Sequence, residues 1–580
     1  MRRRRIGVLL ALAWLPGCAA TGGPGDGGGG QVRGTGFPSE EALEGLREAP
    51  GPEAVFEPGL RDVETWTLRG PFPERVTVEP WSDESPAGRV LARLAETRPG
   101  LVVQTRAMHC VARELGLFFL EHGARPPEGL NRAARGTCRS AASQVNLGWV
   151  EGEAPAEASD EQLLEAWSET VEETIRGQLV GGPRTAGVWL GRDGGRALLM
   201  VAVGERRLHL EPVPEPEADG TLVLEGEALV PASEIHAAVT RGRLGFAYCR
   251  ADELPLPRFR FRCPVDPGDP RVWLTVSLHP PGRLIGQVGV ELLLWPDGAV
   301  DPVYRRPSYA VSRQAWDEET AAAGFAALLN EIREDEGLEP LRVDEPQSAV
   351  ARDLAPHFFE ALFEGSVGVA DLVMLGLLAG WSVDGIVQSA HFASSWVPDT
   401  NDVGRLLSEA LEYPMARSAL LADDAERIAI GPVLEAGENG TSMAVVVGTY
   451  ALFSEESHGA RVEQVFAQLA RERAARGRAA PDRLEDLADL STDLAGAVQA
   501  GAAPQEALHE LLNRSGEALG RAVRGWVLES SELEDIAFPA ELLDERRVSI
   551  SIGVASYRPE GEAWGRHVVL IVAADPGRGI

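Results

Sequence analysis

The sequence of 580 residues is long enough for roughly three or four domains of about 100 to 200 residues each. Its formal net charge is −33, with 88 acidic against 55 basic side chains, which opposes binding to a nucleic-acid backbone. The sequence contains no lysine, which excludes Schiff-base chemistry and a phosphate-binding loop of the Gly-Lys-Ser/Thr type.

The N-terminus has the features of an export signal. Four arginines precede an apolar run from Ile6 to Leu15, which is too short to span a bilayer. The run LPGC that ends at Cys18 resembles the lipobox of bacterial lipoproteins. This resemblance implies a signal peptide over residues 1–17 and a diacylated, palmitate-bearing Cys18; an ordinary secretory signal with a chance cysteine is the alternative.

Residues 18–60 are rich in Gly, Pro and Glu and have no sustained hydrophobic period, which predicts a flexible, disordered tether. In many lipoproteins of bacteria with two membranes, an aspartate after the lipidated cysteine favours retention in the inner membrane. This chain has Ala19 there. The resemblance therefore implies an outer-membrane lipoprotein that faces the periplasm or the cell surface.

The other four cysteines are expected to form disulfides, because an exported compartment is oxidising. Cys110 with Cys138, and Cys249 with Cys263, are the economical pairs, since each lies within one predicted domain. Other pairings remain possible. A metal site built on these cysteines is not expected, because the chain has no Cys-x-x-Cys.

Helical spacing begins the folded part. Helices are predicted around Val90 to Leu94 and Met108 to Phe119, and a helix followed by a hairpin spans Leu163 to Gly204. Together they predict an α+β domain over residues 86–212. Residues 213–312 carry short β-rich runs separated by Pro-Gly and Asp-Gly turns, which predicts an antiparallel β-sandwich.

The stretch from Arg405 to Phe453 has a pattern of helix, break and hairpin. Pro414 ends the helix, and Glu438-Asn439-Gly440 separates two β-rich runs. The same pattern occurs over Leu163 to Gly204 and again over Phe538 to Ala574. Repeats spaced this widely predict domains at 86–212, 313–455 and 456–580, and not a solenoid.

The run LLNEIREDEGLEPLRVDEPQSAVARDLAPHFF resembles the opening of the bacterial form of the CAP superfamily, the cysteine-rich secretory, antigen 5 and pathogenesis-related proteins. The residues that carry the resemblance are Leu329, Asn330, Arg333, Gly337, Leu338, Pro340, Leu341, Asp344 and Ala351. The run YPMARSALL from Tyr413 and the pair Ile430-Gly431 match the end of the domain. The resemblance implies an α-β-α sandwich for 313–455.

The outer domains carry weaker versions of this pattern. Leu469-x-x-x-Arg473 and Leu94-x-x-x-Arg98 have the spacing of Leu329-x-x-x-Arg333. An amphipathic helix with an arginine near its end also occurs by chance. We expect degenerate CAP-like domains at 86–212 and 456–580.

CAP domains that bind a divalent cation do so with two histidines and two glutamates, and this resemblance implies that most of these positions are not filled here. Ala416 replaces one histidine, and only Asp384 stands near an expected glutamate. Glu438-Asn439 belongs to a predicted turn.

Histidines elsewhere are single. His357 and His391 are flanked by Phe and are expected to be half-buried structural residues, and His109 and His122 bracket a helix without a partner motif. We predict no catalytic residues, no metal site and no cofactor.

Two function classes follow. The first is a membrane-anchored envelope lipoprotein whose degenerate CAP-like modules act as a non-catalytic scaffold or bind an envelope protein, a glycan or a lipid. The second is a hydrolase, metal-dependent or metal-independent, that acts on cell-wall or extracellular polymers. The unfilled metal-binding positions favour the first.

Overall fold

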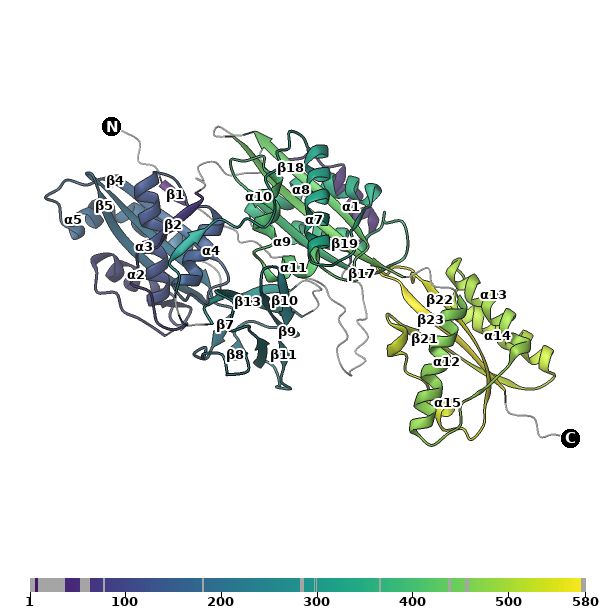
Figure 1. Cartoon of the computed structure of the whole chain (residues 1–580). Coiled ribbons are helices and arrows are strands. Elements are labelled where there is room, and N and C mark those ends of the chain that lie inside the picture. Colours follow the sequence, from purple (N-terminus) through teal and green to yellow (C-terminus); the bar gives the residue numbers. More distant parts are fainter. Residues whose placement is uncertain are drawn as a thin grey trace. The chain divides into compact units, whose positions relative to one another are not determined.

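The computed structural model describes residues 6–8, 37–52, 63–76, 79–179, 182–281, 286–296, 298, 300–364, 367–436, 440–453 and 458–574 (Figure 1). The chain folds into two compact units. One consists mainly of Pro38–Leu378 and His391–Thr449, and the other mainly of Ala379–Ala390 and Tyr450–Ile580. Helices and strands mix throughout, so the fold class is α+β, as the sequence predicts. Cys18 and the pair Glu438-Asn439 lie outside the described residues.

Three segments of the chain share one order of elements. The first repeat contains α2 (Pro86–Ala95), β3 (Val102–Gln104), α3 (Arg106–His122), α4 (Glu128–Thr137), β4 (Val145–Glu153), α5 (Asp160–Ala166), α6 (Ser168–Gln178), β5 (Arg184–Asp193) and β6 (Arg196–Glu205). The second contains α7 (Glu318–Asp335), β16 (Arg342–Val343), α8 (Glu345–Glu364), α9 (Val367–Ala379), β17 (Val387–Val397), α10 (Val403–Ala410), α11 (Pro414–Leu420), β18 (Arg427–Ala436) and β19 (Thr441–Leu452). The third contains α12 (His458–Ala475), β20 (Asp482–Arg483), η1 (Glu485–Leu487), α13 (Ala488–Gln499), α14 (Pro504–Leu519), β21 (Val523–Ser530), η2 (Leu533–Asp535), α15 (Ala540–Asp544), β22 (Ser549–Tyr557) and β23 (Arg566–Ala574).

The sheets of the three repeats also share one strand order: β3-β5-β6-β4, β16-β18-β19-β17 and β20-β22-β23-β21. In each repeat the short first strand runs parallel to the first strand of the closing hairpin. In the first repeat, β1 (Ile6–Val8), inside the expected export signal, adds antiparallel to β4. Shared element order and shared strand order make the three segments copies of one architecture.

A buried arginine ties the first helix of the second repeat to the segment that precedes its closing hairpin. Arg333 on α7 is 0% exposed, and its Nε donates to the carbonyl O of Glu339 at 2.8 Å. Its Nη1 donates at 2.9 Å to the carbonyl O of Leu420, the last residue of α11. Backbone carbonyls satisfy these donors, so the charge is buried without leaving them unpaired.

An arginine makes the corresponding contacts in the outer repeats; it is buried in the third repeat and half-buried in the first. Arg473 on α12 is also 0% exposed, and its Nε donates to the carbonyl O of Ala479 at 2.9 Å, while its Nη1 donates to that of Leu542. In the first repeat, Arg98 donates from Nη1 to the carbonyl O of Leu179. The Leu-x-x-x-Arg spacing is only a weak sequence signal in the outer repeats, but its arginine has the same structural role in all three repeats.

One glycine in each hairpin lets a helix lie directly on the sheet. A Cβ atom at any of the three positions would come within about 2.2 Å of the backbone of the covering helix. The pairs of glycine and helix residue are Gly431 with Ala351 of α8, Gly553 with Ser491 of α13, and Gly187 with Met108 and His109 of α3.

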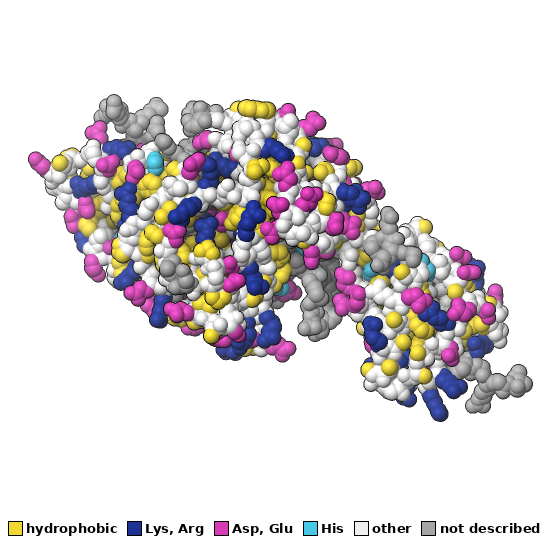
Figure 2. Space-filling view, in the orientation of Figure 1, with side chains coloured by type: hydrophobic (Ala, Val, Ile, Leu, Met, Phe, Trp, Pro, Cys, Tyr) yellow, Lys and Arg dark blue, Asp and Glu magenta, His cyan; other side chains and the backbone are white. Residues whose placement is uncertain are grey.

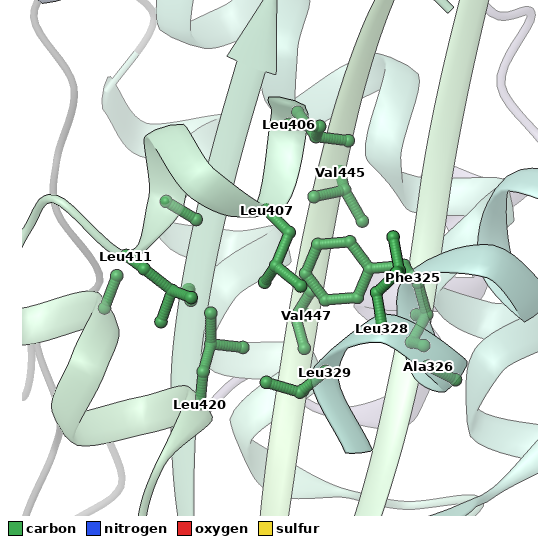
Figure 3. Close-up of a cluster of buried hydrophobic side chains, with 14 of the residues drawn as sticks. Phe325, Ala326, Leu328, Leu329, Leu406, Leu407, Leu411, Leu420, Val445 and Val447 are labelled. Atoms are coloured by element: carbon green, nitrogen blue, oxygen red, sulfur yellow. The ribbon is translucent and has the colours of Figure 1, made fainter. Parts of the chain in front are cut away.

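The core of the second repeat lies between its sheet and its helices (Figure 3). Phe325, Leu328 and Leu329 of α7 and Leu406 and Leu407 of α10 surround Val445 and Val447 of β19. Val446 is 0% exposed, although it points to the other side of the strand. The strand lies inside the sheet between β18 and β17, which explains why it is apolar on both faces.

An antiparallel sandwich was predicted over residues 213–312, and strands between residues 208 and 294 form two antiparallel sheets. One sheet has the order β10-β9-β13-β14 and the other β11-β12-β8-β7. The strands are β7 (Leu208–Leu210), β8 (Thr221–Ala228), β9 (Glu234–Arg241), β10 (Gly245–Tyr248), β11 (Arg250–Ala251), β12 (Arg258–Pro264), β13 (Val272–His279) and β14 (Gln287–Leu294). A separate pair joins β2 (Thr65–Thr67) to β15 (Val303–Arg305).

The prediction of a disordered tether over residues 18–60 is wrong in part, because α1 (Glu40–Arg47) forms there. Ser39 caps the helix by accepting from the backbone N–H of Ala42. Leu43 is 4% exposed, and Arg47 pairs with Asp353 of α8 at 2.6 Å. Packing against the second repeat, which sequence composition does not report, orders this segment.

Candidate functional site

Helix α11 carries the position at which the CAP resemblance expects a metal-binding histidine. Ala416 occupies that position and is 2% exposed. Met415 beside it packs on Ala238 of β9, and Arg417 donates from Nη1 to the carbonyl O of Gly245 at 3.0 Å. Ala416 itself lies in the hydrophobic core of the second repeat, which closes this position to solvent, while its neighbours on α11 contact the sandwich.

Next to α11 lies a buried cluster that joins the first repeat, the sandwich and the second repeat. We call it the junction; its members are Arg132 of α4, Trp273 of β13, Glu291 of β14, and Glu412 and Tyr413 between α10 and α11. The Arg132 guanidinium lies 3.6 Å from the ring centroid of Trp273 and 3.7 Å from that of Tyr413. Arginine suits this place because its planar cation stacks on aromatic faces.

Hydrogen bonds also fix the orientation of the Arg132 guanidinium. Arg132 donates from Nε and Nη2 to the two carboxylate oxygens of Glu291, at 2.9 and 2.7 Å. Its Nη1 donates to the carbonyl O of Glu412 at 3.0 Å. Arg132 is 3% and Glu291 4% exposed, so a bidentate ion pair is buried between three parts of the chain.

The Glu412 carboxylate is held by three further donors. Arg271 Nη2 and Tyr309 Oη donate to Oε1 at 2.9 and 3.1 Å, and Trp273 Nε1 donates to Oε2 at 3.1 Å. Glu412 is 7% exposed. These contacts make Glu412 a connector between the sandwich and the second repeat.

Burial also shifts the titration of groups around the junction. It raises the pKa of Tyr413 well above the usual value of a phenol, and it raises the pKa of the Glu128 carboxyl on α4. For Arg132, burial lowers the pKa, but the Glu291 carboxylate offsets this effect and the pKa is raised. Arg132 therefore stays charged and Tyr413 neutral, which suits a structural contact.

The histidines of the second repeat are buried. His357 and His391 are each 7% exposed. Burial lowers the pKa of His391, and the Asp424 carboxylate, 3.9 Å from its Nε2, opposes this shift. These rings are more buried than the sequence predicts.

In the first repeat, His109 Nδ1 lies 3.3 Å from the Asp83 carboxylate, and burial lowers the pKa of His109. His122 packs against the rings of Trp66 and Phe118, with centroids 5.3 and 4.4 Å apart. Within the described residues, no group of three or more His, Cys, Asp or Glu side chains could hold a metal ion.

The structure contains two disulfides. One joins Cys110 of α3 to Cys138 after α4, and the other joins Cys249, between β10 and β11, to Cys263 of β12. Both are the pairs expected from the sequence. Asp384 lies in the loop before β17, away from α11 in sequence.

Sequence reasoning missed the junction. A usable signal was Glu291, a lone carboxylate inside the apolar run QVGVELLLW, because a charge in a strand that is buried on both faces requires a partner. The partner on α4 could not be identified from one sequence.

Among the described residues, no helix has the length and hydropathy needed to cross a membrane. No family model matches the chain, and the comparison with curated proteins found no match. Solved structures do match, including a cysteine-rich secretory protein from Staphylococcus aureus subsp. aureus Mu50. That match has 10% sequence identity and a TM-score of 0.17, and covers 42% of this chain and 84% of that one.

Proposed function

We propose that this chain is an envelope lipoprotein, anchored to the outer membrane through Cys18, whose degenerate CAP-like repeats form a non-catalytic scaffold that binds an envelope partner. The observation that carries the proposal is the burial of Ala416: this position lies in the core of the second repeat, and its neighbour Met415 on the same helix packs against the sandwich. Helix α11 thus serves in holding domains together.

The junction supports the same proposal. A buried ion pair stacked between two rings fixes the first repeat, the sandwich and the second repeat as one body. A rigid body held away from a membrane by an N-terminal lipid presents a constant surface to a partner.

Metal content tests the non-catalytic part. The purified chain, incubated with excess zinc and then desalted, is expected to retain less than one equivalent of metal and to leave purified cell wall undigested. Stoichiometric zinc, or release of soluble wall fragments by the unmodified chain, would overturn the scaffold proposal in favour of the hydrolase. The matched control is Asp384→Asn, which removes the carboxylate nearest to an expected ligand position.

Metabolic labelling tests the anchor. In cells that are grown with labelled palmitate and produce the full chain, the chain should incorporate the label. The Cys18→Ser variant should not incorporate it. Cys249→Ser, which leaves the N-terminus intact, is the control. Labelling that persists in Cys18→Ser would refute the lipid anchor without affecting the metal test.

A further inference from the structure

The sandwich contains a corner at which the chain changes from one sheet to the other. Strand β10 pairs with β9 in one sheet, and β11 pairs with β12 in the other. Cys249 stands between β10 and β11, and its disulfide to Cys263 of β12 fixes the corner. Residues on either side of Cys249 therefore hold definite positions on the outer surface.

A pocket of about 640 Å³ opens at this corner. Its walls carry two cations, three carboxylates, a hydroxyl and one aromatic ring: Arg250, Arg262, Glu217, Asp219, Asp252, Thr221 and Tyr248. Figure 2 shows basic and acidic side chains intermixed over the part of the sandwich that carries β8 and β11. The pocket therefore offers donors and acceptors side by side, unlike a mostly apolar small-molecule site.

The register of the strands places the two cations together. Arg250 of β11 lies directly opposite Arg262 of β12, and like charges in that arrangement repel. Asp252 receives a hydrogen bond from Arg262 Nε at 3.3 Å, whereas Arg250 has no ion-pair partner within the described part of the chain. The Arg250 guanidinium can therefore donate hydrogen bonds to a ligand at this place.

Asp219, one of the carboxylate acceptors of the pocket, is held by a hydrogen bond from the backbone. The backbone N–H of Thr221 donates to Asp219 Oδ1 at 2.9 Å, and this bond lowers the pKa of Asp219. Asp219 therefore carries its charge at neutral pH and keeps lone pairs for a donor from outside.

Tyr248 provides an apolar surface at the same place. It is 43% exposed, and its ring makes an edge contact with Phe246 on the same strand, with ring centroids 5.8 Å apart. A tyrosine oriented in this way presents both a ring face and a polar end.

We propose that this corner pocket binds a neutral saccharide chain. Each hydroxyl of a sugar both donates and accepts, so it can bond to a guanidinium and to a carboxylate at once. The C–H face of a sugar ring matches the exposed ring of Tyr248. A simple anion would meet three carboxylates and a simple cation two guanidiniums, so neither fits the pocket as a whole.

This inference deepens the proposed binding function by naming a ligand class, and it rests on that function only for its biological setting. The pocket is separate from α11 and the junction. Failure of saccharide binding would therefore leave the scaffold proposal and its metal test unchanged.

Calorimetric titration of the purified full chain with two neutral probes, a tetramer of N-acetylglucosamine and maltotetraose, tests the proposal. At least one probe should bind with a dissociation constant in the millimolar range or tighter. Tyr248→Ala and Arg250→Ala should each weaken that binding about tenfold, which corresponds to about 1.4 kcal/mol. Inorganic phosphate should not compete.

Two variants serve as matched controls. Arg258→Ala removes an exposed arginine from β12 outside the pocket, and Trp316→Ala removes an aromatic ring that is 80% exposed elsewhere. Both should bind the probe as the unmodified chain does. Absence of binding by both probes, equal binding by the Tyr248 and Arg250 variants, or displacement by phosphate would each overturn the proposal.

Discussion

Replacing Arg132 should loosen the contact among the first repeat, the sandwich and the second repeat. In Arg132→Met the stem of the side chain still fills space between the rings of Trp273 and Tyr413, but Glu291 loses both bonds at 2.7 and 2.9 Å. Breaking a buried ion pair by removing one partner costs about 3 to 5 kcal/mol. The lower end of this range applies here, because Arg135 Nη2 lies 3.5 Å from Glu291 Oε2 and remains beside the carboxylate. The stacked cation adds about 2 kcal/mol or less, which overlaps with that figure.

Hydrogen exchange of the intact chain can measure this loss. Peptides from α4, β14 and the segment between α10 and α11 should exchange faster in Arg132→Met, by roughly two to three orders of magnitude where opening of the junction limits exchange. Peptides from the third repeat should not change. Arg258→Ala, an exposed arginine in the same sandwich, is the control and should exchange as the unmodified chain does.

The double variant Arg132→Met with Glu291→Leu removes both partners. It therefore separates the loss of the attraction between them from the cost of leaving the Glu291 carboxylate buried without Arg132. Because a buried ion pair can be replaced by apolar side chains at little cost, the double variant should recover much of the protection. If Arg132→Met exchanges within threefold of the unmodified chain, the junction does not hold the domains together and the reasoning fails.

Further predictions concern the core, the disulfides and pH. Val446→Asp and Val447→Asp should each destabilise the second repeat by several kcal/mol, because both faces of β19 are buried; retention of the native urea midpoint by either would contradict this. Peptide mapping without reductant should recover Cys110 joined to Cys138, whereas free thiols at both would refute the pairing. Burial lowers the pKa of His567 to about 4. The unfolded chain then takes up a proton near pH 6.5 that the folded chain takes up only near pH 4. Stability of the third repeat should therefore fall by up to about 3 kcal/mol as the pH drops from about 6.5 to about 4, and His567→Gln should flatten this slope in thermal unfolding.

The sequence alone determined the elements whose periodicity is strong. The faces of α7 and α10, the hairpins that end each repeat, and the strands of the sandwich followed from helical and strand periods and from turn residues. The recurrence of one helix and hairpin pattern also predicted the repeated architecture, because each copy must bury the same faces.

The strand order of the sheets needed tertiary structure, because β3, β16 and β20 are two or three residues long and have no periodicity. The same is true of α1, which is polar in sequence and ordered by contact with α8. Short elements depend on distant partners, and one sequence does not identify such partners.

The candidate site was decided by packing in the same way. Sequence spacing located Ala416 and the absence of a histidine there, but only the fold places α11 against the sandwich. Arg132, Glu291 and Glu412 are each ordinary in local sequence. They form the junction because α4, β14 and the end of α10 meet in space, and burial makes their charges dependent on one another.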